Sequence, residues 1–185
     1  IESQPFLEAI RQVSLEQGKE NCLFIHVTLV PYLKSSGEHK SKPTQHSVKE
    51  LRTMGISPDI IVMRSDEPID ESIREKISLF CNVKPDCVIE NMTIPVLYEA
   101  PLMLEKAKFS WIVCRELGLD AGPCEMTEWQ TMVDRIKARK ECVKIAIVGK
   151  YVKLHDAYLS VAEALKHGGY ENSCHIDIKW VEAED

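Results

Sequence analysis

The sequence predicts an α/β protein with a parallel β-sheet. Short, nearly continuous apolar runs rich in branched residues, at 22–30, 59–63 and 86–89, are typical of strands covered on both faces of such a sheet. Segments with helical spacing of apolar residues separate these runs, and this alternation favours right-handed crossover connections. A length of 185 residues permits one sizeable core or two smaller ones, so the order of the elements has to decide the domain organisation.

The first helix and strand are marked by their end residues. Ser3 followed by Pro5 is a typical helix start, and Gly18 can end the helix, which predicts a helix over about 5–17. The apolar run at 22–30 is then expected to form a strand that is covered on both faces.

A polar loop at 31–43 leads to a second helix, which Thr44 can cap and Gly55 can end. The next buried strand is expected at 59–63, and Asp70 announces a further helix. The apolar positions of that helix are Ile73, Ile77 and Phe80.

A strand at 86–89 and a helix at 98–106 continue the alternation. The strand pattern then stops, and the segment 118–142 is interpreted as a linker. Within it, Thr127 begins a capping-box pattern that predicts a charged helix to about residue 138.

A β-α-β unit is predicted near the end of the chain. Its strands are expected at 143–148 and 174–181, with an amphipathic helix at 156–167 that the glycine pair 168–169 stops. Three regions result, with boundaries at 1–117, 118–142 and 143–185.

Charge and composition exclude several classes of protein. The formal net charge of −6 argues against a general nucleic-acid binder, and no apolar run approaches the roughly 20 residues that a membrane helix needs. Seven scattered cysteines without a CxxC pair fit neither a zinc site nor a disulfide framework, and they favour buried free thiols in a reducing cytoplasm. The chain begins at Ile1 without an initiator Met, which suggests an incomplete protein.

The segment 37–45 (GEHKSKPTQ) is the main candidate for a binding site. It places Lys40, Lys42, two hydroxyl groups and an amide just before a helix start, where Pro43 stiffens the chain. Cations, hydroxyl donors and free backbone N–H groups are what a polyphosphate requires. By composition alone, a solvated basic loop is the favoured interpretation, because short basic stretches are common on protein surfaces.

Several segments together resemble the CTP synthase family. They occur in the family's order and at its spacings, and they are IESQPFLEAIR at 1–11, KSKPTQ at 40–45 with SVKELR at 47–52, SPDIIV at 57–62, KISLFC at 76–81 and IVGKY at 147–151. The Lys-x-Lys-Pro-Thr-Gln loop is far more specific than a lone glycine pattern.

The resemblance implies an enzyme that makes CTP from UTP, ATP and glutamine. ATP phosphorylates O4 of the uracil ring, and ammonia from a glutaminase domain displaces the phosphate. It also implies Mg²⁺, GTP as an activator, and dimers that pair into tetramers. Residues 1–117 then correspond to the C-terminal half of a synthetase domain with a Rossmann-like, P-loop-type sheet, and 143–185 to the start of a class I glutamine amidotransferase domain. Catalytic residues and metal ligands are expected outside this chain.

The resemblance also implies roles for particular residues. The triphosphate of UTP, and CTP as feedback inhibitor at an overlapping site, would contact Lys40, Ser41, Lys42, Pro43, Thr44 and Gln45. Glu2 would help to recognise the cytosine or ribose. The motif Met92-Thr93-Ile94 stands where relatives carry His-Asp-Val or Lys-Asp-Val against adenine, so it is assigned to ATP although the acid is absent.

Lys76 and Phe80 are four residues apart, so a helix would place both on one face. In a family member they would face the pyrimidine nucleotide. The alternative is a core Phe beside a surface Lys. For the whole chain, the alternatives are a non-catalytic nucleotide-binding or regulatory fragment, and a redox protein that uses its thiols.

Overall fold

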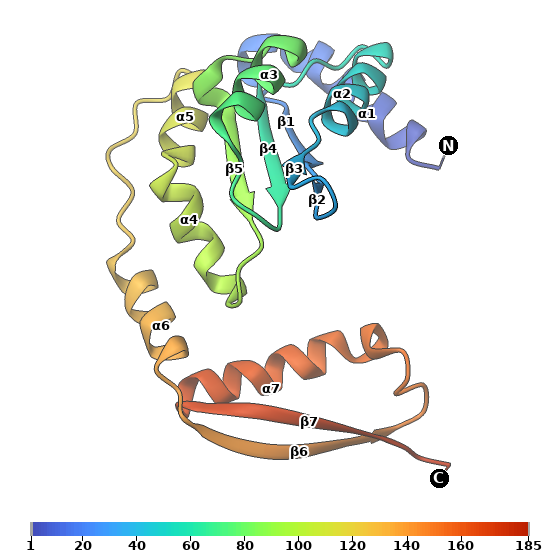
Figure 1. Cartoon of the computed structure of the whole chain (residues 1–185), viewed down its shortest axis with the longest axis vertical. Coiled ribbons are helices and arrows are strands. Elements are labelled where there is room, and N and C mark those ends of the chain that lie inside the picture. Colours follow the sequence, from blue (N-terminus) through green and yellow to red (C-terminus); the bar gives the residue numbers. More distant parts are fainter. Residues whose placement is uncertain (1, 185) are drawn as a thin grey trace. The chain divides into compact units, whose positions relative to one another are not determined.

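The computed structural model describes residues 2–184 (Figure 1). It divides the chain into two compact units, residues 1–125 and 126–185. Each unit is described separately below. None of the described helices is both long enough and apolar enough to span a membrane.

The first unit contains a parallel sheet of β1 (Ile25–Leu29), β4 (Ile60–Ser65) and β5 (Val88–Met92), in the order β1-β4-β5. Helices α2 (Lys42–Thr53) and α3 (Glu71–Cys81) connect the strands. The predicted α/β class with a parallel sheet is therefore confirmed.

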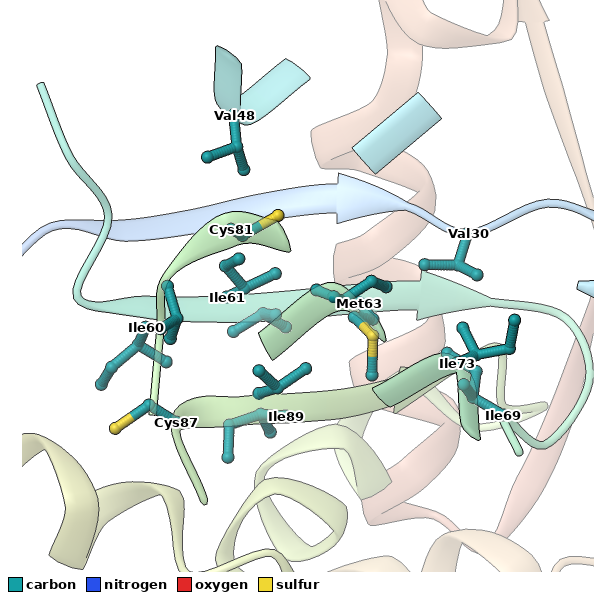
Figure 2. Packing of buried hydrophobic residues seen from close by; sticks show 14 of the residues in the cluster. Val30, Val48, Ile60, Ile61, Met63, Ile69, Ile73, Cys81, Cys87 and Ile89 are labelled. Atoms are coloured by element: carbon teal, nitrogen blue, oxygen red, sulfur yellow. The ribbon is translucent and has the colours of Figure 1, made fainter. Parts of the chain in front are cut away.

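The core of this unit surrounds β4, which has a neighbour on each side. Ile60, Ile61, Val62 and Met63 are all buried, as the continuous apolar run predicted. Figure 2 shows Ile60, Ile61 and Met63 packed among side chains from the helices and the neighbouring strands. The cluster also includes Val30, Val48, Ile69, Ile73, Ile77, Cys81, Cys87, Val88, Ile89 and Ile112.

Strand β1 is covered on one face only, so the expectation that both faces are covered is wrong for this strand. His26 and Thr28 face α2, where they contact Ser47 and Thr44. The alternate residues Ile25, Val27 and Leu29 are exposed. The reason is that α2 packs on the face that carries His26 and Thr28, whereas the opposite face is left uncovered by the described residues.

The segment before α2 is more ordered than a polar loop. It forms a hairpin of β2 (Tyr32–Leu33) and β3 (Glu38–His39), paired in antiparallel fashion. Helix α2 begins at Lys42 with Ser41 at the N-cap position, so the prediction that Thr44 caps the helix is wrong. Pro43 in the first turn explains the earlier start, because its fixed φ suits that position.

Helix α1 (Gln4–Gln17) forms as predicted and ends at Gly18, whose φ of 86° suits glycine. A short 3-10 turn, η1 (Lys19–Asn21), leads into β1. None of the described residues of α1 is buried, and its apolar residues Phe6, Ile10 and Val13 are exposed.

The chain after α3 differs from the prediction at two places. Residues Pro85–Cys87 form a 3-10 turn, η2, so the strand expected at 86–89 begins at Val88 and continues to Met92. The helix expected at 98–106 forms as η3 (Leu97–Glu99) and α4 (Ala100–Lys106). It is followed by an unpredicted helix, α5 (Phe109–Glu116).

The second unit contains α6 (Thr127–Lys137) and the predicted β-α-β arrangement. Strands β6 (Glu141–Gly149) and β7 (Cys174–Glu182) pair in parallel, and η4 (His155–Tyr158) and α7 (Leu159–Glu171) connect them. Met126 occupies the N-cap of α6, so Thr127 lies inside the helix and the predicted capping box is not formed at this position. Val133 and Ile136 of α6 are buried.

The glycine pair 168–169 does not stop α7, which continues to Glu171. Gly169 is buried, and a Cβ placed on it would lie 2.7 Å from both Cys174 O and Ile176 Cγ1. This glycine therefore permits close packing of the helix against β7, which is a different use of glycine from helix termination.

Candidate functional site

The candidate residues follow the carboxyl ends of parallel strands. Strands β1, β4 and β5 run in the same direction, so the segments after Leu29, Ser65 and Met92 leave the same edge of the sheet. Ligands of open α/β sheets bind at this edge. The segment 40–45 follows β1 through the hairpin, and Thr93 follows β5 directly.

The start of α2 offers oriented donors for an anion. The first turn of any helix has backbone N–H groups without intrahelical partners, and the helix dipole adds positive potential there. Within this turn, Gln45 Nε2 donates to Ser41 Oγ at 3.1 Å, which orders both side chains. Lys42 and Pro43 are exposed beside them.

Thr44 has a structural role that the sequence did not reveal. Its side chain is fully buried, and its hydroxyl donates to Leu29 O at 3.2 Å and lies 3.2 Å from Thr28 Oγ1. The hydroxyl is therefore used inside the unit. Only the backbone N–H of Thr44 is left for a ligand at the helix start.

The hairpin supplies one of the two candidate lysines. Lys40 Nζ forms an ion pair with the carboxylate of Glu38. This hydrogen bond lowers the pKa of Glu38, and the positive charge of Lys76 on α3 lowers it further. Of the charges acting on Glu38, that of Lys40 is the one in direct contact with its carboxylate.

Phe80 is 62% exposed, so the alternative of a core Phe is wrong. The buried positions of α3 include Ile73, Ile77 and Cys81, which lie on another side of the helix. Lys76 is exposed as well. An ammonium group and an aromatic ring are thus both available on the outer surface of α3.

Thr93 joins the ends of two strands. Its backbone N–H donates to Ser65 O at 2.8 Å, and its hydroxyl donates to Asp66 Oδ1 at 2.7 Å. Met92 lines a cavity of about 610 Å³ together with Met103 and Trp111. The two half-buried side chains of this motif, Met92 and Ile94, can therefore supply apolar contacts.

Glu2 is exposed before α1, and the structure records no contact between it and residues 40–45 within the described part of the chain. Two cavities of the first unit, about 510 and 610 Å³, are lined by other residues than 40–45. Among the described residues, Lys40 and Lys42 lie next to the start of α2, and neither of these two cavities includes them.

Three hairpin residues beside the site were missed by sequence reasoning. The rings of Tyr32 and His39 lie 4.9 Å apart, and His39 is 5% exposed with its Nε2 unpaired in the part of the chain that the structure describes. Glu38 contacts Lys40. The sequence feature that could have predicted the Glu38–Lys40 contact is their spacing of two residues, because a strand places such residues on one face.

A family model described as CTP synthase N-terminus matches residues 1–119. The chain belongs to the CTP synthase family. Over all of its 185 residues it is 59% identical to the CTP synthase of Clostridium kluyveri, 58% to that of Ruminiclostridium cellulolyticum and 53% to that of Streptococcus pyogenes serotype M28. It covers 34%, 35% and 35% of these proteins, so it spans about a third of the length of the curated relatives it matches.

Both units take part in this CTP synthase similarity. The family model ends within the first unit, whereas the three relatives also match residues 126–185. The second unit therefore corresponds to a segment of these CTP synthases as well.

Proposed function

We propose that this chain forms part of a CTP synthase, a ligase that uses ATP and ammonia from glutamine to convert UTP into CTP. The observation that carries the proposal is the start of α2, where Lys42 and free backbone donors lie beside Lys40 at the carboxyl edge of a parallel sheet. Lys76, which is exposed on α3, is proposed as a third cation of the site. This arrangement suits a triphosphate.

The proposed UTP site divides into a phosphate part and a base part. Lys40, Lys42, Gln45 and the backbone of the first turn bind the triphosphate, and Pro43 keeps that turn in place. Lys76 and the exposed ring of Phe80 face the pyrimidine nucleotide. CTP, as feedback inhibitor, occupies an overlapping site in which Glu2 contributes to recognition of the base or ribose.

The ATP site is proposed at Met92, Thr93 and Ile94. Since the Thr93 hydroxyl is bonded to Asp66, the contacts to adenine come from the backbone and from the apolar side chains on either side. The absence of the family's acid at Thr93 is compatible with such contacts.

The remaining parts of the reaction are assigned outside this chain. Following the family resemblance, Mg²⁺ is expected to be held by acids of another segment. The cysteine nucleophile of the glutaminase is likewise expected elsewhere. We further propose that residues 1–117 belong to the synthetase domain with its P-loop-type sheet, that 118–142 link the domains, and that 143–185 begin the glutaminase domain.

Regulation and assembly follow the family in this proposal. The protein is a cytoplasmic enzyme, assembles as dimers that pair into tetramers, and is activated by GTP. Cys124 and Cys142 are exposed, so the expectation that the thiols are buried is wrong at these two positions.

The test joins this chain to the segments of the Clostridium kluyveri CTP synthase that lie outside the match, which gives a protein called here the extended protein. We expect it to convert UTP into CTP in the presence of ATP, Mg²⁺ and glutamine. A complete lack of conversion by a correctly folded extended protein would contradict the assignment. Binding of UTP and CTP without conversion would favour a non-catalytic regulatory role.

The isolated chain is expected to be inactive and to bind UTP weakly or not at all, because the family's nucleotide site is shared between subunits. Calorimetry of the isolated chain tests this. Micromolar UTP binding by a monomer would contradict the shared site.

A further inference from the structure

The β2–β3 hairpin presents two opposite charges to solvent. Glu38 and Lys40 alternate with His39, so they share one face while His39 lies on the other. His39 is buried against Tyr32, whereas the side chains of Glu38 and Lys40 are 54% and 40% exposed. The contact of buried His39 with half-buried Tyr32 therefore holds the hairpin in a position in which the two charges face outward.

The Glu38 carboxylate contacts one of the cations assigned above to UTP, Lys40. Lys40 Nζ donates directly to Glu38 Oε1. The pKa of Glu38 is lowered first by this hydrogen bond and also by the charge of Lys76. An ammonium group donates equally well to a carboxylate oxygen and to a phosphate oxygen. Glu38 therefore occupies N–H donors of Lys40 that a phosphate would need.

We propose that Glu38 is a built-in competing anion, whose carboxylate occupies part of the triphosphate position until a nucleotide displaces it. This inference rests on the proposed function, because it takes Lys40 and Lys76 as nucleotide contacts. Displacement is easy because the Glu38–Lys40 pair is exposed, and such pairs contribute little stability. A polyphosphate carries several negative charges and can displace the single carboxylate of Glu38 from Lys40. A singly charged anion is attracted less strongly, because the carboxylate already neutralises that ammonium group.

The role differs from that of a residue that positions Lys40. A positioning carboxylate would raise nucleotide affinity by ordering the ammonium group, and its removal would weaken binding. A competing carboxylate lowers affinity, and its removal strengthens binding. The sign of the change therefore separates the two roles.

The experiment measures the affinity of the extended protein for UTP and for inorganic triphosphate by calorimetry, at low and high sodium chloride. The variant is Glu38→Gln, which keeps the shape of the side chain and removes its charge. The matched control is Glu163→Gln in the second unit. It breaks another Glu–Lys pair, in which Lys166 Nζ lies 2.7 Å from Glu163 Oε1, and it changes the net charge equally.

We expect Glu38→Gln to bind both ligands about two- to five-fold more tightly, on the scale of an exposed ion pair. Its affinity should also fall more steeply with salt, because chloride replaces the lost carboxylate at the lysines. Glu163→Gln should match the unsubstituted protein. A second variant, Glu38→Ala, should also bind both ligands more tightly. It removes the charge without introducing an amide, so it tests the same role if the amide of Glu38→Gln disturbs the hairpin.

If the unsubstituted protein binds both ligands and both Glu38 variants bind them equally or more weakly, the competing role of Glu38 is wrong. The proposed function is not affected by that result. Failure of the unsubstituted extended protein to bind either UTP or triphosphate overturns both this inference and the proposed function. Equal strengthening by Glu163→Gln also overturns the inference, because it attributes the gain to net charge.

Discussion

The hydroxyl groups of Thr28 and Thr44 lie 3.2 Å apart in the core of the first unit and join strand β1 to the first turn of α2. Thr44 is fully buried, and its hydroxyl also donates to Leu29 O. The helix start that carries the candidate lysines is thus fixed to the sheet by polar contacts rather than by apolar packing alone.

Thr44→Val tests this connection. Valine keeps the shape of the side chain, but the variant leaves Leu29 O and Thr28 with fewer partners in a buried place, which should lower the free energy of unfolding by about 1–2 kcal/mol. Urea denaturation measures the change. The control is Thr53→Val on the same helix, where the exposed hydroxyl donates only to Glu50 O and the change should stay within about 0.5 kcal/mol. Equal stability of Thr44→Val and the unsubstituted protein would contradict the connecting role.

The candidate lysines make a second prediction. Lys40→Ala and Lys42→Ala in the extended protein should each weaken UTP binding about ten-fold or more, because a hydrogen bond to a charged group contributes roughly 1.5–3 kcal/mol. Lys49→Ala, an exposed change further along α2, should have little effect. If both variants keep their affinities for UTP and CTP, the assignment of Lys40 and Lys42 to the nucleotide site is wrong.

Sequence reasoning predicted the alternation of strands and helices well, because the apolar runs at β1 and β4 are long enough to show their type. It missed the hairpin β2–β3, whose strands have two residues each and cannot show a period. It also placed Thr44 at the helix cap, since a hydroxyl residue beside proline suits that position in isolation. Only the packing against β1 shows that this hydroxyl points inward.

The candidate site was likewise predictable in part. The segment 40–45 could be found from its lysines and from its resemblance to a family. Whether Phe80 of α3 is buried or exposed depends on tertiary structure. The contact between Glu38 and Lys40 could not be inferred without the hairpin. Long-range relations of this kind leave no periodic signal in the sequence.

An ion-pair network makes the third prediction. Arg115 of α5 contacts Asp86 and lies 2.6 Å from Glu116 Oε1, while Lys84 Nζ lies 2.8 Å from Glu116 Oε2. The hydrogen bond from Arg115 lowers the pKa of Asp86, and those from Lys84 and Arg115 lower the pKa of Glu116. Both carboxylates therefore bind protons less readily in the folded state than in the unfolded state.

Because the two pKa values are lowered, Asp86 and Glu116 stabilise the folded state at pH values above their ordinary pKa values of 3.8 and 4.5. This stabilisation is lost as the pH falls below those values. Arg115→Met keeps an apolar contact with Trp111 but removes the charge, so the difference in unfolding free energy between pH 7 and acid should shrink. Urea midpoints across this range measure it. Arg135→Met, which breaks the Arg135–Glu171 pair in the other unit, is the control, and an equal effect there would contradict the assignment.

The cysteines make the fourth prediction. Burial raises the pKa of Cys87 to about 11 and also raises the pKa of Cys81, so neither forms the reactive thiolate near neutral pH. Under native conditions at pH 8, iodoacetamide should label the exposed Cys124 and Cys142 first. Mass spectrometry of timed samples measures the order, and denatured protein should label at all seven thiols. Rapid native labelling of Cys87 would contradict its burial and revive a thiol-based function.

Two adjacent glycines of α7 make the last prediction, because they should respond to the same substitution with opposite signs. No neighbouring atom lies within 4 Å of a Cβ added to Gly168, so Gly168→Ala should stabilise the helix by roughly 0.5–1 kcal/mol through its higher helix propensity. A Cβ on Gly169 would lie 2.7 Å from the backbone oxygen of Cys174, which cannot move aside without disturbing β7. Gly169→Ala should therefore lower stability by about 1–3 kcal/mol, as overpacking does. Urea denaturation of the two variants, followed by circular dichroism, compares them directly, and stabilisation by both would show that α7 and β7 pack less closely than described.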